Sequence, residues 1–332
     1  MRRVGTPGWE PDAFKPLFRS PHLQTILPQF WPTGFDPRRF PTQIRYFQTD
    51  QDTQVLAHCS HHTREQEGNR PAGVLLIVHG LTGSSTSAYI LRLTLRALQA
   101  GFDVVRLNIR NCGRTEHLCS TLYHSGLTSD LRVVAEQMQD HPLYLVGFSM
   151  GGNIVLKLAG EWGQHFPSHI RAICAVSIPL DLAACARRLG QRQNHFYELR
   201  FLRELRQTVR RKQILQPAKY SLARFARVRS IVDFDEAYTA PCFGFRNAQD
   251  YYEHSSAKSF LSSIRIPTLM LQAQDDPFIP FEIFGKLPFD KNPNLNLSAP
   301  LHGGHTGFLS SQRPRFWDAE QILKFCTLVS GR

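Results

Sequence analysis

The sequence predicts an α/β fold, in which a mainly parallel central sheet is flanked by helices and interrupted by a helical insertion. From residue 73 onward, short apolar runs alternate with helix-like runs, which is the signature of a parallel sheet covered on both faces. Before that point, two runs alternate apolar and polar residues around a polar turn, which is typical of a hairpin at a sheet edge. After residue 182, a long arginine-rich stretch separates two of the apolar runs.

Eight strands are predicted, and the first two form the hairpin around the turn Thr49–Thr53. The later strands are nearly continuous apolar runs, as expected for strands that are buried on both faces. Residues 9–41 are rich in proline and aromatic residues, and we expect this N-terminal segment to wrap around the core of a single domain, residues 1–332. The predicted strands lie near residues 43–48, 54–60, 73–79, 103–109, 143–147, 171–177, 267–273 and 294–299.

The most informative motif is a Gly-x-Ser-x-Gly pentapeptide, Gly147–Gly151. It follows the apolar run Leu143–Val146 and precedes the helix-like run Asn153–Ala159. A strand, a tight turn and a helix are what a nucleophile elbow requires, because the turn points the serine side chain into open space. Ser149 is therefore the candidate nucleophile. An ordinary glycine-rich turn would contain the same pattern. Residues elsewhere in the chain must therefore distinguish a nucleophile elbow from such a turn.

Candidate partners for the serine lie downstream. Asp275 and Asp276 follow one of the predicted parallel strands, and His302 and His305 follow the last one. Serine, aspartate and histidine in this order is the chain order of the α/β-hydrolases. Adjacent side chains on a loop point to different sides, so only one aspartate can support the catalytic histidine. We choose Asp276 and expect Asp275 to be a turn or strand-end residue.

These residue types have complementary chemical roles. The Ser149 hydroxyl is a weak nucleophile until a base removes its proton, and an imidazole can take this proton and return it to a leaving alcohol. An aspartate fixes the imidazole tautomer and stabilises the imidazolium. The glycine loop His79–Gly83 and the helix start after the serine offer backbone N–H groups for an oxyanion, and we assign this role to Leu81 and Met150. Such chemistry needs no metal and no organic cofactor.

Several motifs spread over nearly the whole chain resemble the YheT-like branch of the α/β-hydrolases, also called AB hydrolase family 4. They are Phe14–Thr25, His79–Ser84, Asn108–Gly113, Tyr123–Gly126, Gly147–Gly152, Asp275–Phe278 and His302–Phe308. The resemblance implies an α/β-hydrolase fold, a catalytic triad of Ser149, Asp276 and His305, and hydrolysis of short-chain or lipid-like carboxylic esters. It selects His305 over His302, which is then expected to be a loop histidine bonded to the backbone. His79 is expected to shape the loop that follows it.

The insertion carries nearly all of the net charge. Residues 187–230 contain thirteen lysines and arginines against two glutamates, a net +11 of the formal +12 of the chain. An insertion at this point of an α/β-hydrolase commonly forms a cap over the active site, so we expect residues 181–260 to form a helical basic cap. Two stripes follow helical spacing, one apolar and one basic: Leu199, Leu202, Leu205 and Val209, and Arg200, Arg203, Arg206 and Arg210. Such a helix either packs its leucines on the core or lies on an anionic membrane surface, and packing is the commoner arrangement.

We therefore predict a serine hydrolase that cleaves carboxylic esters through an acyl-enzyme intermediate. The same intermediate would also serve an acyltransferase or a thioesterase. Binding of nucleic acid through the basic insertion is the weaker alternative, because Phe196, Tyr197 and Phe201 form no recognised single-strand-binding motif. The expected partner is a small-molecule or lipid ester, with contact to an anionic membrane as a further alternative.

Composition sets the cellular context. No apolar run approaches the roughly 20 residues that span a bilayer, and the first ten residues lack the apolar segment of a signal peptide. Seven cysteines without a Cys-x-x-Cys pair favour reduced thiols over a disulfide framework. The histidine cluster His58–His62 lacks the spacing of a zinc site, so we expect solvated loop histidines. These features predict a cytoplasmic protein.

Overall fold

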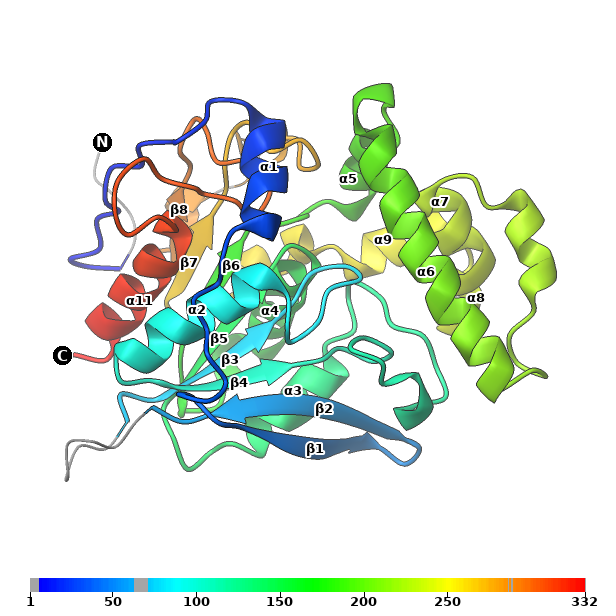
Figure 1. Ribbon diagram of the computed structural model, residues 1–332, viewed down its shortest axis with the longest axis horizontal. Coiled ribbons are helices and arrows are strands. Elements are labelled where there is room, and N and C mark those ends of the chain that lie inside the picture. Colours follow the sequence, from blue (N-terminus) through cyan, green and yellow to red (C-terminus); the bar gives the residue numbers. More distant parts are fainter. Residues whose placement is uncertain (1–5, 63–70, 286, 288, 332) are drawn as a thin grey trace.

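The computed structural model describes residues 6–62, 71–285, 287 and 289–331. Its eight strands are β1 (Thr42–Asp50), β2 (Thr53–Ser60), β3 (Val74–Val78), β4 (Asp103–Leu107), β5 (Leu143–Phe148), β6 (Ile170–Val176), β7 (Thr268–Leu271) and β8 (Leu295–Ser298). They form one sheet in the order β1-β2-β4-β3-β5-β6-β7-β8 (Figure 1). β1, β2 and β4 pair antiparallel, and all pairs from β4 through β8 are parallel. The predicted α/β fold with a mainly parallel sheet is confirmed.

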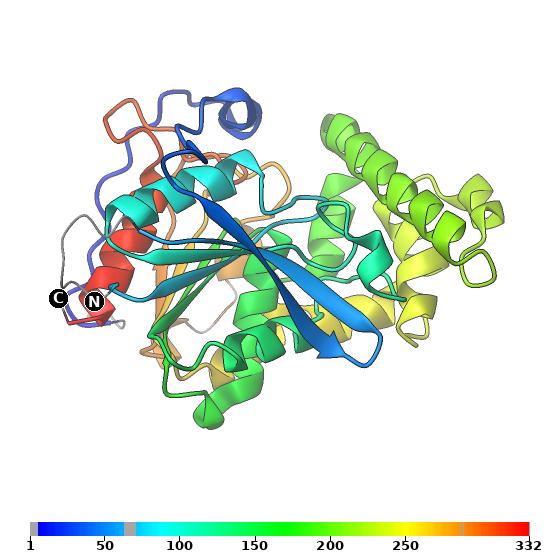
Figure 2. The same ribbon diagram turned by 60° about the horizontal axis from the view of Figure 1, so that its bottom comes forward.

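The sheet is strongly twisted, and Figure 2 shows β1 and β2 crossing the direction of the strands behind them. Alternate residues of the central strands face opposite sides of the sheet. On β3, Leu75 and Ile77 join one hydrophobic cluster, whereas Leu76 and Val78 join the other. Helices cover both clusters: α2 (Ala88–Gln99) and α11 (Trp317–Val329) on the first side, α3 (Ser129–Glu136) and α4 (Met150–Trp162) on the second.

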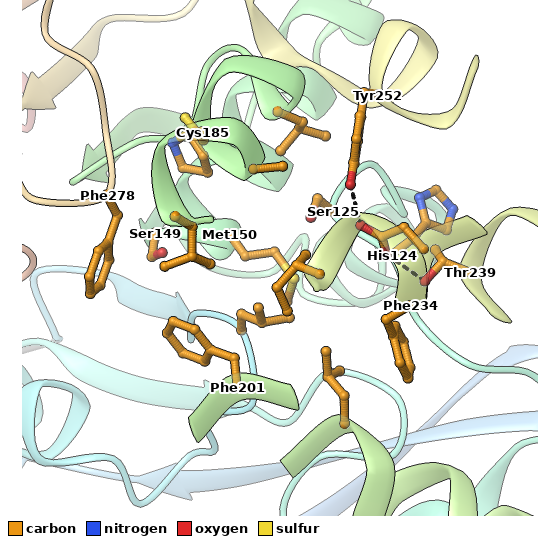
Figure 3. Close-up of a pocket in the computed structure, with 18 of the residues that line it drawn as sticks. His124, Ser125, Ser149, Met150, Cys185, Phe201, Phe234, Thr239, Tyr252 and Phe278 are labelled. Atoms are coloured by element: carbon orange, nitrogen blue, oxygen red, sulfur yellow. Dashed lines mark hydrogen bonds between the residues drawn. The ribbon is translucent and has the colours of Figure 1, made fainter. Parts of the chain in front are cut away.

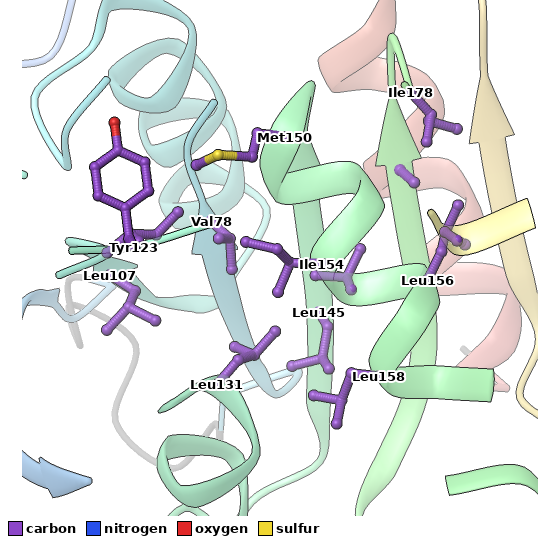
Figure 4. Packing of buried hydrophobic residues seen from close by; sticks show 14 of the residues in the cluster. Val78, Leu107, Tyr123, Leu131, Leu145, Met150, Ile154, Leu156, Leu158 and Ile178 are labelled. Atoms are coloured by element: carbon purple, nitrogen blue, oxygen red, sulfur yellow. The ribbon is translucent and has the colours of Figure 1, made fainter. Parts of the chain in front are cut away.

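Packing on the second side centres on α4, and most of its residues are buried. Figure 4 shows Val78 of β3, Leu145 of β5 and Ile154 of α4 packed against one another. Burial on both faces explains why the central strands are read as continuous apolar runs, because neither side of these strands meets water. It also fixes the position of the helix that follows Ser149.

The chain before β1 packs against α11 and against the loop that follows β8. The ring of Trp9 meets that of Phe325 edge-on, with centroids 5.2 Å apart. Further along, α1 (Pro21–Phe30) carries Gln24, whose side chain donates to the carbonyl of Leu309 at 2.9 Å and accepts the N–H of the same residue at 2.8 Å. The N-terminal segment therefore holds a loop that lies at the opposite end of the sequence.

Between β6 and β7, the chain forms a group of helices that Figure 1 shows at one end of the molecule, beyond the sheet. In α6 (His195–Leu215), Leu202, Leu205 and Val209 are buried, but Leu199 is 48% exposed. The predicted apolar stripe was wrong at this residue, because the first turn of α6 buries Tyr197, which packs edge-on against Phe278 with ring centroids 4.7 Å apart. The helices are α5 (Leu182–Leu189), α6 (His195–Leu215), α7 (Ile231–Phe234), α8 (Ala240–Cys242) and α9 (Ala248–Ser255).

Part of the basic charge of the insertion is structural. Lys212 of α6 is 0% exposed, and its ammonium group donates to the carbonyl oxygens of Glu116 and Cys119. The neighbouring Arg211 pairs with the Glu116 carboxylate at 2.7 Å. Burial lowers the pKa of Lys212. These contacts attach α6 to the loop after β4, so this lysine is not available to a membrane or a nucleic acid.

The histidines near residue 60 are not simply solvated, because His58 on β2 bonds to Ser85 Oγ at 2.6 Å and His62 bonds to Asp103 at 2.8 Å. All seven cysteines are free thiols, as predicted. Among the described residues, no helix is both long and apolar enough to cross a bilayer.

Asp318, in the first turn of α11, is a buried carboxylate. One of its oxygens has no hydrogen-bond partner among the described residues. Burial raises the pKa of Asp318 from 3.8 to about 7, although the guanidinium of Arg92 acts in the opposite direction. The native state therefore binds more protons than the unfolded state between these two pH values, and the stability that depends on Asp318 falls as the pH rises through this window.

We predict that Asp318→Asn removes this pH dependence, because the amide does not ionise. Between about pH 4 and about pH 8, the free energy of unfolding of the variant should rise relative to the wild type by up to about 4 kcal/mol. Urea denaturation of both proteins across this range measures the difference. A difference that stays constant with pH would contradict the prediction.

Candidate active site

Ser149 stands at the turn between β5 and α4. Its φ of 53° and ψ of −120° are a strained combination for a residue with a side chain. The glycines of the motif permit the turn, because a methyl group on Gly147 would lie 2.2 Å from the Gly151 carbonyl oxygen. One on Gly151 would lie 2.4 Å from the carbonyl oxygen of Val78. The pentapeptide thus forms the sharp strand–turn–helix connection of a nucleophile elbow.

Three side chains from distant parts of the chain meet at this turn. Ser149 Oγ lies 2.9 Å from Nε2 of His305, and Nδ1 of the same ring lies 2.8 Å from Oδ2 of Asp276. A carboxylate only accepts hydrogen bonds, so Nδ1 carries the ring proton and Nε2 is left to accept the serine hydroxyl. The structure therefore brings together the three residues that the sequence nominated, in the order that an activated serine requires.

The Asp276 carboxylate is buried and is held by several donors. It is 2% exposed, and its Oδ1 accepts the N–H groups of Phe278 at 2.9 Å and Ile279 at 3.2 Å. Its Oδ2 accepts Nε2 of Gln272 at 3.2 Å. These bonds offset the cost of burying the charge, since no lysine or arginine among the described residues forms an ion pair with Asp276. Gln272 was not identified as a site residue from the sequence, where it was only part of an apolar run.

The other aspartate and the other histidine form a second pair. Asp275 Oδ2 lies 3.1 Å from Nδ1 of His302, and its Oδ1 accepts the N–H of Gly304 at 2.9 Å. The expectation that His302 bonds to the backbone was wrong, because the two adjacent aspartates point to different sides and each reaches one histidine. The His302 side chain is 33% exposed, against 9% for His305. This pair holds the loop instead of reaching the serine.

The loop that carries His305 is also held by the N-terminal segment. The His305 N–H donates to Thr25 Oγ1 at 2.9 Å, and the next N–H, of Thr306, donates to Ser177 Oγ at 2.9 Å. A methyl group on Gly307 would lie 1.8 Å from the carbonyl oxygen of Gln24, so α1 touches the loop backbone directly. Thr25 lies within a motif of the family resemblance, but its function was not recognised from the sequence alone.

The glycine loop after β3 lies against the nucleophile. A methyl group on Gly80 would be 3.0 Å from the Cβ of Ser149. Leu81 and Met150 line the same pocket as the serine. In the part of the chain that the structure describes, neither of their N–H groups donates a hydrogen bond to a protein acceptor. Both predicted oxyanion donors are therefore free beside Ser149.

His79 shapes this loop, as expected. Its Nδ1 donates to the Gly80 carbonyl oxygen at 2.7 Å, and its Nε2 accepts the N–H of Ile109 at 3.1 Å. Burial lowers the pKa of His79 to about 4, so the ring stays neutral and keeps this tautomer at neutral pH. The two bonds tie the loop after β3 to the loop after β4.

Two spaces meet at Ser149. The inner one is a mostly apolar pocket between the sheet and the insertion, where Figure 3 shows Met150, Phe201 and Phe234 around its interior. The outer one is a cleft between α1 and the start of α6, lined by Phe30 and Arg200 among others. Ser149 and His305 line both spaces. A molecule bound at the Ser149 hydroxyl can therefore extend into both spaces.

Known proteins share this sequence pattern. The sequence model of the alpha/beta hydrolase fold matches residues 73–312. The Escherichia coli (strain K12) protein "Putative esterase YheT" is 31% identical over 325 residues, which cover 93% of this chain and 91% of the relative. The monoacylglycerol lipase of Saccharomyces cerevisiae is 29% identical over 273 residues, covering 76% of this chain but only 58% of the lipase.

Solved structures share the fold. The Pyrococcus furiosus esterase Pf2001 superimposes with a TM-score of 0.57 at 15% identity, covering 88% of this chain and 95% of that chain. The match to the fold model extends over most of the chain, and the E. coli relative is similar along nearly its whole length. The chain therefore belongs to the α/β-hydrolase family, and the resemblance to its YheT-like branch is confirmed.

Proposed function

We propose that this protein is a serine hydrolase that cleaves carboxylic esters through an acyl-enzyme intermediate. The hydrogen-bonded row from Ser149 through His305 to Asp276 carries the proposal, because each bond has the direction that catalysis needs. The names of the relatives, an esterase and a lipase, support ester hydrolysis as the reaction class.

The first half of the reaction forms the acyl-enzyme. His305 Nε2 takes the Ser149 proton as Oγ attacks the ester carbonyl carbon, and Asp276 stabilises the imidazolium that results. The carbonyl oxygen becomes an oxyanion that accepts the N–H groups of Leu81 and Met150. When the tetrahedral intermediate collapses, the alkoxide leaves and takes the proton from Nε2.

The second half of the reaction releases the acid. Water enters where the alcohol left, and His305 takes one of its protons as the oxygen attacks the acyl carbonyl carbon. Collapse of this second intermediate returns the proton to Ser149 Oγ and frees the carboxylic acid. No step requires a group from outside the chain other than the ester and water.

The acyl group is proposed to occupy the inner pocket, and the alcohol the outer cleft. Apolar side chains such as Leu182, Leu189 and Leu205 line the inner pocket and suit a chain of methylene groups. The outer cleft contains Arg200 and hydroxyl groups, which suit a polar alcohol. Esters with lipid-like acyl groups are the substrate class that this division favours.

Replacing the nucleophile should abolish turnover. Ser149→Ala is expected to lower kcat on the order of 10⁶-fold if the triad acts as a unit. The measurement is hydrolysis of p-nitrophenyl esters from acetate to palmitate by wild type and variant, with circular dichroism to confirm folding. A folded variant with near-full activity would contradict the assignment of Ser149 as the nucleophile.

The two adjacent aspartates provide a matched test of the third residue. Asp276→Asn should lower kcat by about 10⁴-fold, because the amide supports the wrong tautomer of His305. Asp275→Asn changes the same atoms one residue earlier, and since it acts on the loop alone it should cost less than about tenfold in kcat. Steady-state kinetics on one ester compares the pair. Equal losses, or a larger loss for Asp275→Asn, would mean that the aspartates are assigned the wrong way round.

A further inference from the structure

The inner pocket is apolar near Ser149 but polar at its far end. Asp235, Thr239 and Tyr252 line it there. Figure 3 shows Tyr252, Thr239 and His124 across the pocket from Ser149, and its dashed lines mark the hydrogen bonds that Tyr252 and Thr239 each make to Asp235. Thr239 Oγ1 donates to Oδ1 of Asp235 at 2.7 Å, and the Tyr252 hydroxyl donates to Oδ2 at 2.7 Å.

Asp235 is an unusual residue for this position. It is 9% exposed, and among the described residues no lysine, arginine or histidine forms an ion pair with it. Burying a carboxylate with only neutral partners is costly, and burial raises the pKa of Asp235 to about 6. Filling the end of an acyl pocket does not require a carboxylate, since leucine would do so without this cost. Asp235 also begins a π-helical segment, Asp235–Thr239, and such segments are frequent at functional sites.

The carboxylate of Asp235 retains capacity for a ligand. Each carboxylate oxygen can accept about two hydrogen bonds, and each accepts one from the protein here. The remaining acceptor positions lie at a residue that lines the pocket. Resting on the proposed function, we propose that the inner pocket selects acyl groups with a hydroxyl at the end distant from the ester, which donates to Asp235.

The surroundings favour a neutral hydroxyl over an ammonium group as this donor. His124 lines the same end of the pocket, and burial, together with the positive charges of Lys157 and Arg110, lowers its pKa to about 3. An ammonium group would meet a similar loss of hydration at this buried end of the pocket. A hydroxyl gives up less hydration and still finds a strong acceptor. The substrate class is therefore an ester of a hydroxylated fatty acid.

The first test needs no variant. Each p-nitrophenyl ester of a straight-chain acid, from acetate to palmitate, is compared with its terminally hydroxylated counterpart. We expect kcat/KM to favour the hydroxylated ester by about tenfold over the range of chain lengths that reaches Asp235, since a bond to a charged acceptor replaces one to water. Terminally aminated esters form a third series and should react more slowly than the hydroxylated ones.

The second test replaces Asp235 and measures the change in preference for hydroxylated over plain esters. Asp235→Leu should lose the preference for hydroxylated esters and keep, or improve, hydrolysis of the plain ones. Glu236→Gln is the matched control: Glu236 is the adjacent acid and is exposed, and within the described part of the chain its carboxylate accepts only the N–H of Ala248 at 2.7 Å, away from the pocket. This variant should keep the wild-type preference.

The outcomes separate the two proposals. Serine-dependent hydrolysis without a preference for the hydroxylated esters at any length overturns the inference and leaves the proposed function standing. A preference that persists in Asp235→Leu, or a stronger preference for the aminated esters, also overturns it. Hydrolysis that is equal in wild type and Ser149→Ala instead overturns the proposed function, and the inference with it.

Discussion

The turn at Ser149 is held in a strained conformation by the neighbours of β5 in the middle of the sheet. The Ser149 N–H donates to the carbonyl of Val176 at the end of β6 at 2.8 Å, and Gly151 approaches the carbonyl of Val78 at the end of β3. Such backbone strain costs on the order of 1–3 kcal/mol, and it persists only when the surrounding structure fixes it. Because parallel strands end at the same edge, the loops that carry Leu81 and His305 converge on the same point.

The sequence predicted the parts of the fold and the site that depend on local patterns. Each central strand is buried on both faces, so its apolar run is visible without knowledge of its neighbours. Ser149 was identified from a pentapeptide in which Gly147 is required by the close approach of Gly151, four residues later, although Gly151 itself is required by the carbonyl of Val78 on a neighbouring strand. Asp276 and His305 were nominated from chain order and family resemblance, and the structure places both within hydrogen-bond distance of their partners.

Features that depend on distant contacts were not predicted. Leu199 is exposed because Tyr197 occupies the inner side of the first turn of α6, and no periodicity distinguishes these two positions. Lys212 is buried because carbonyl groups of a loop almost a hundred residues earlier accept hydrogen bonds from its ammonium group. The role of Thr25 depends on a residue 280 positions later. In each case, several side chains have the same local pattern, and tertiary packing decides which of them is buried or forms the hydrogen bond.

Because the inner pocket and the outer cleft meet at Ser149, the alcohol would leave and water would enter by the same route. In the proposed reaction, the acyl chain would fill the inner pocket once the ester is cleaved, and the departed alcohol would leave the outer cleft empty. Water must then arrive by the route that the first product has just used, past α1 and the start of α6. The molecule that occupies the outer cleft would then set the product. Water would hydrolyse the acyl-enzyme to a carboxylic acid, and a second alcohol would accept the acyl group and form a new ester.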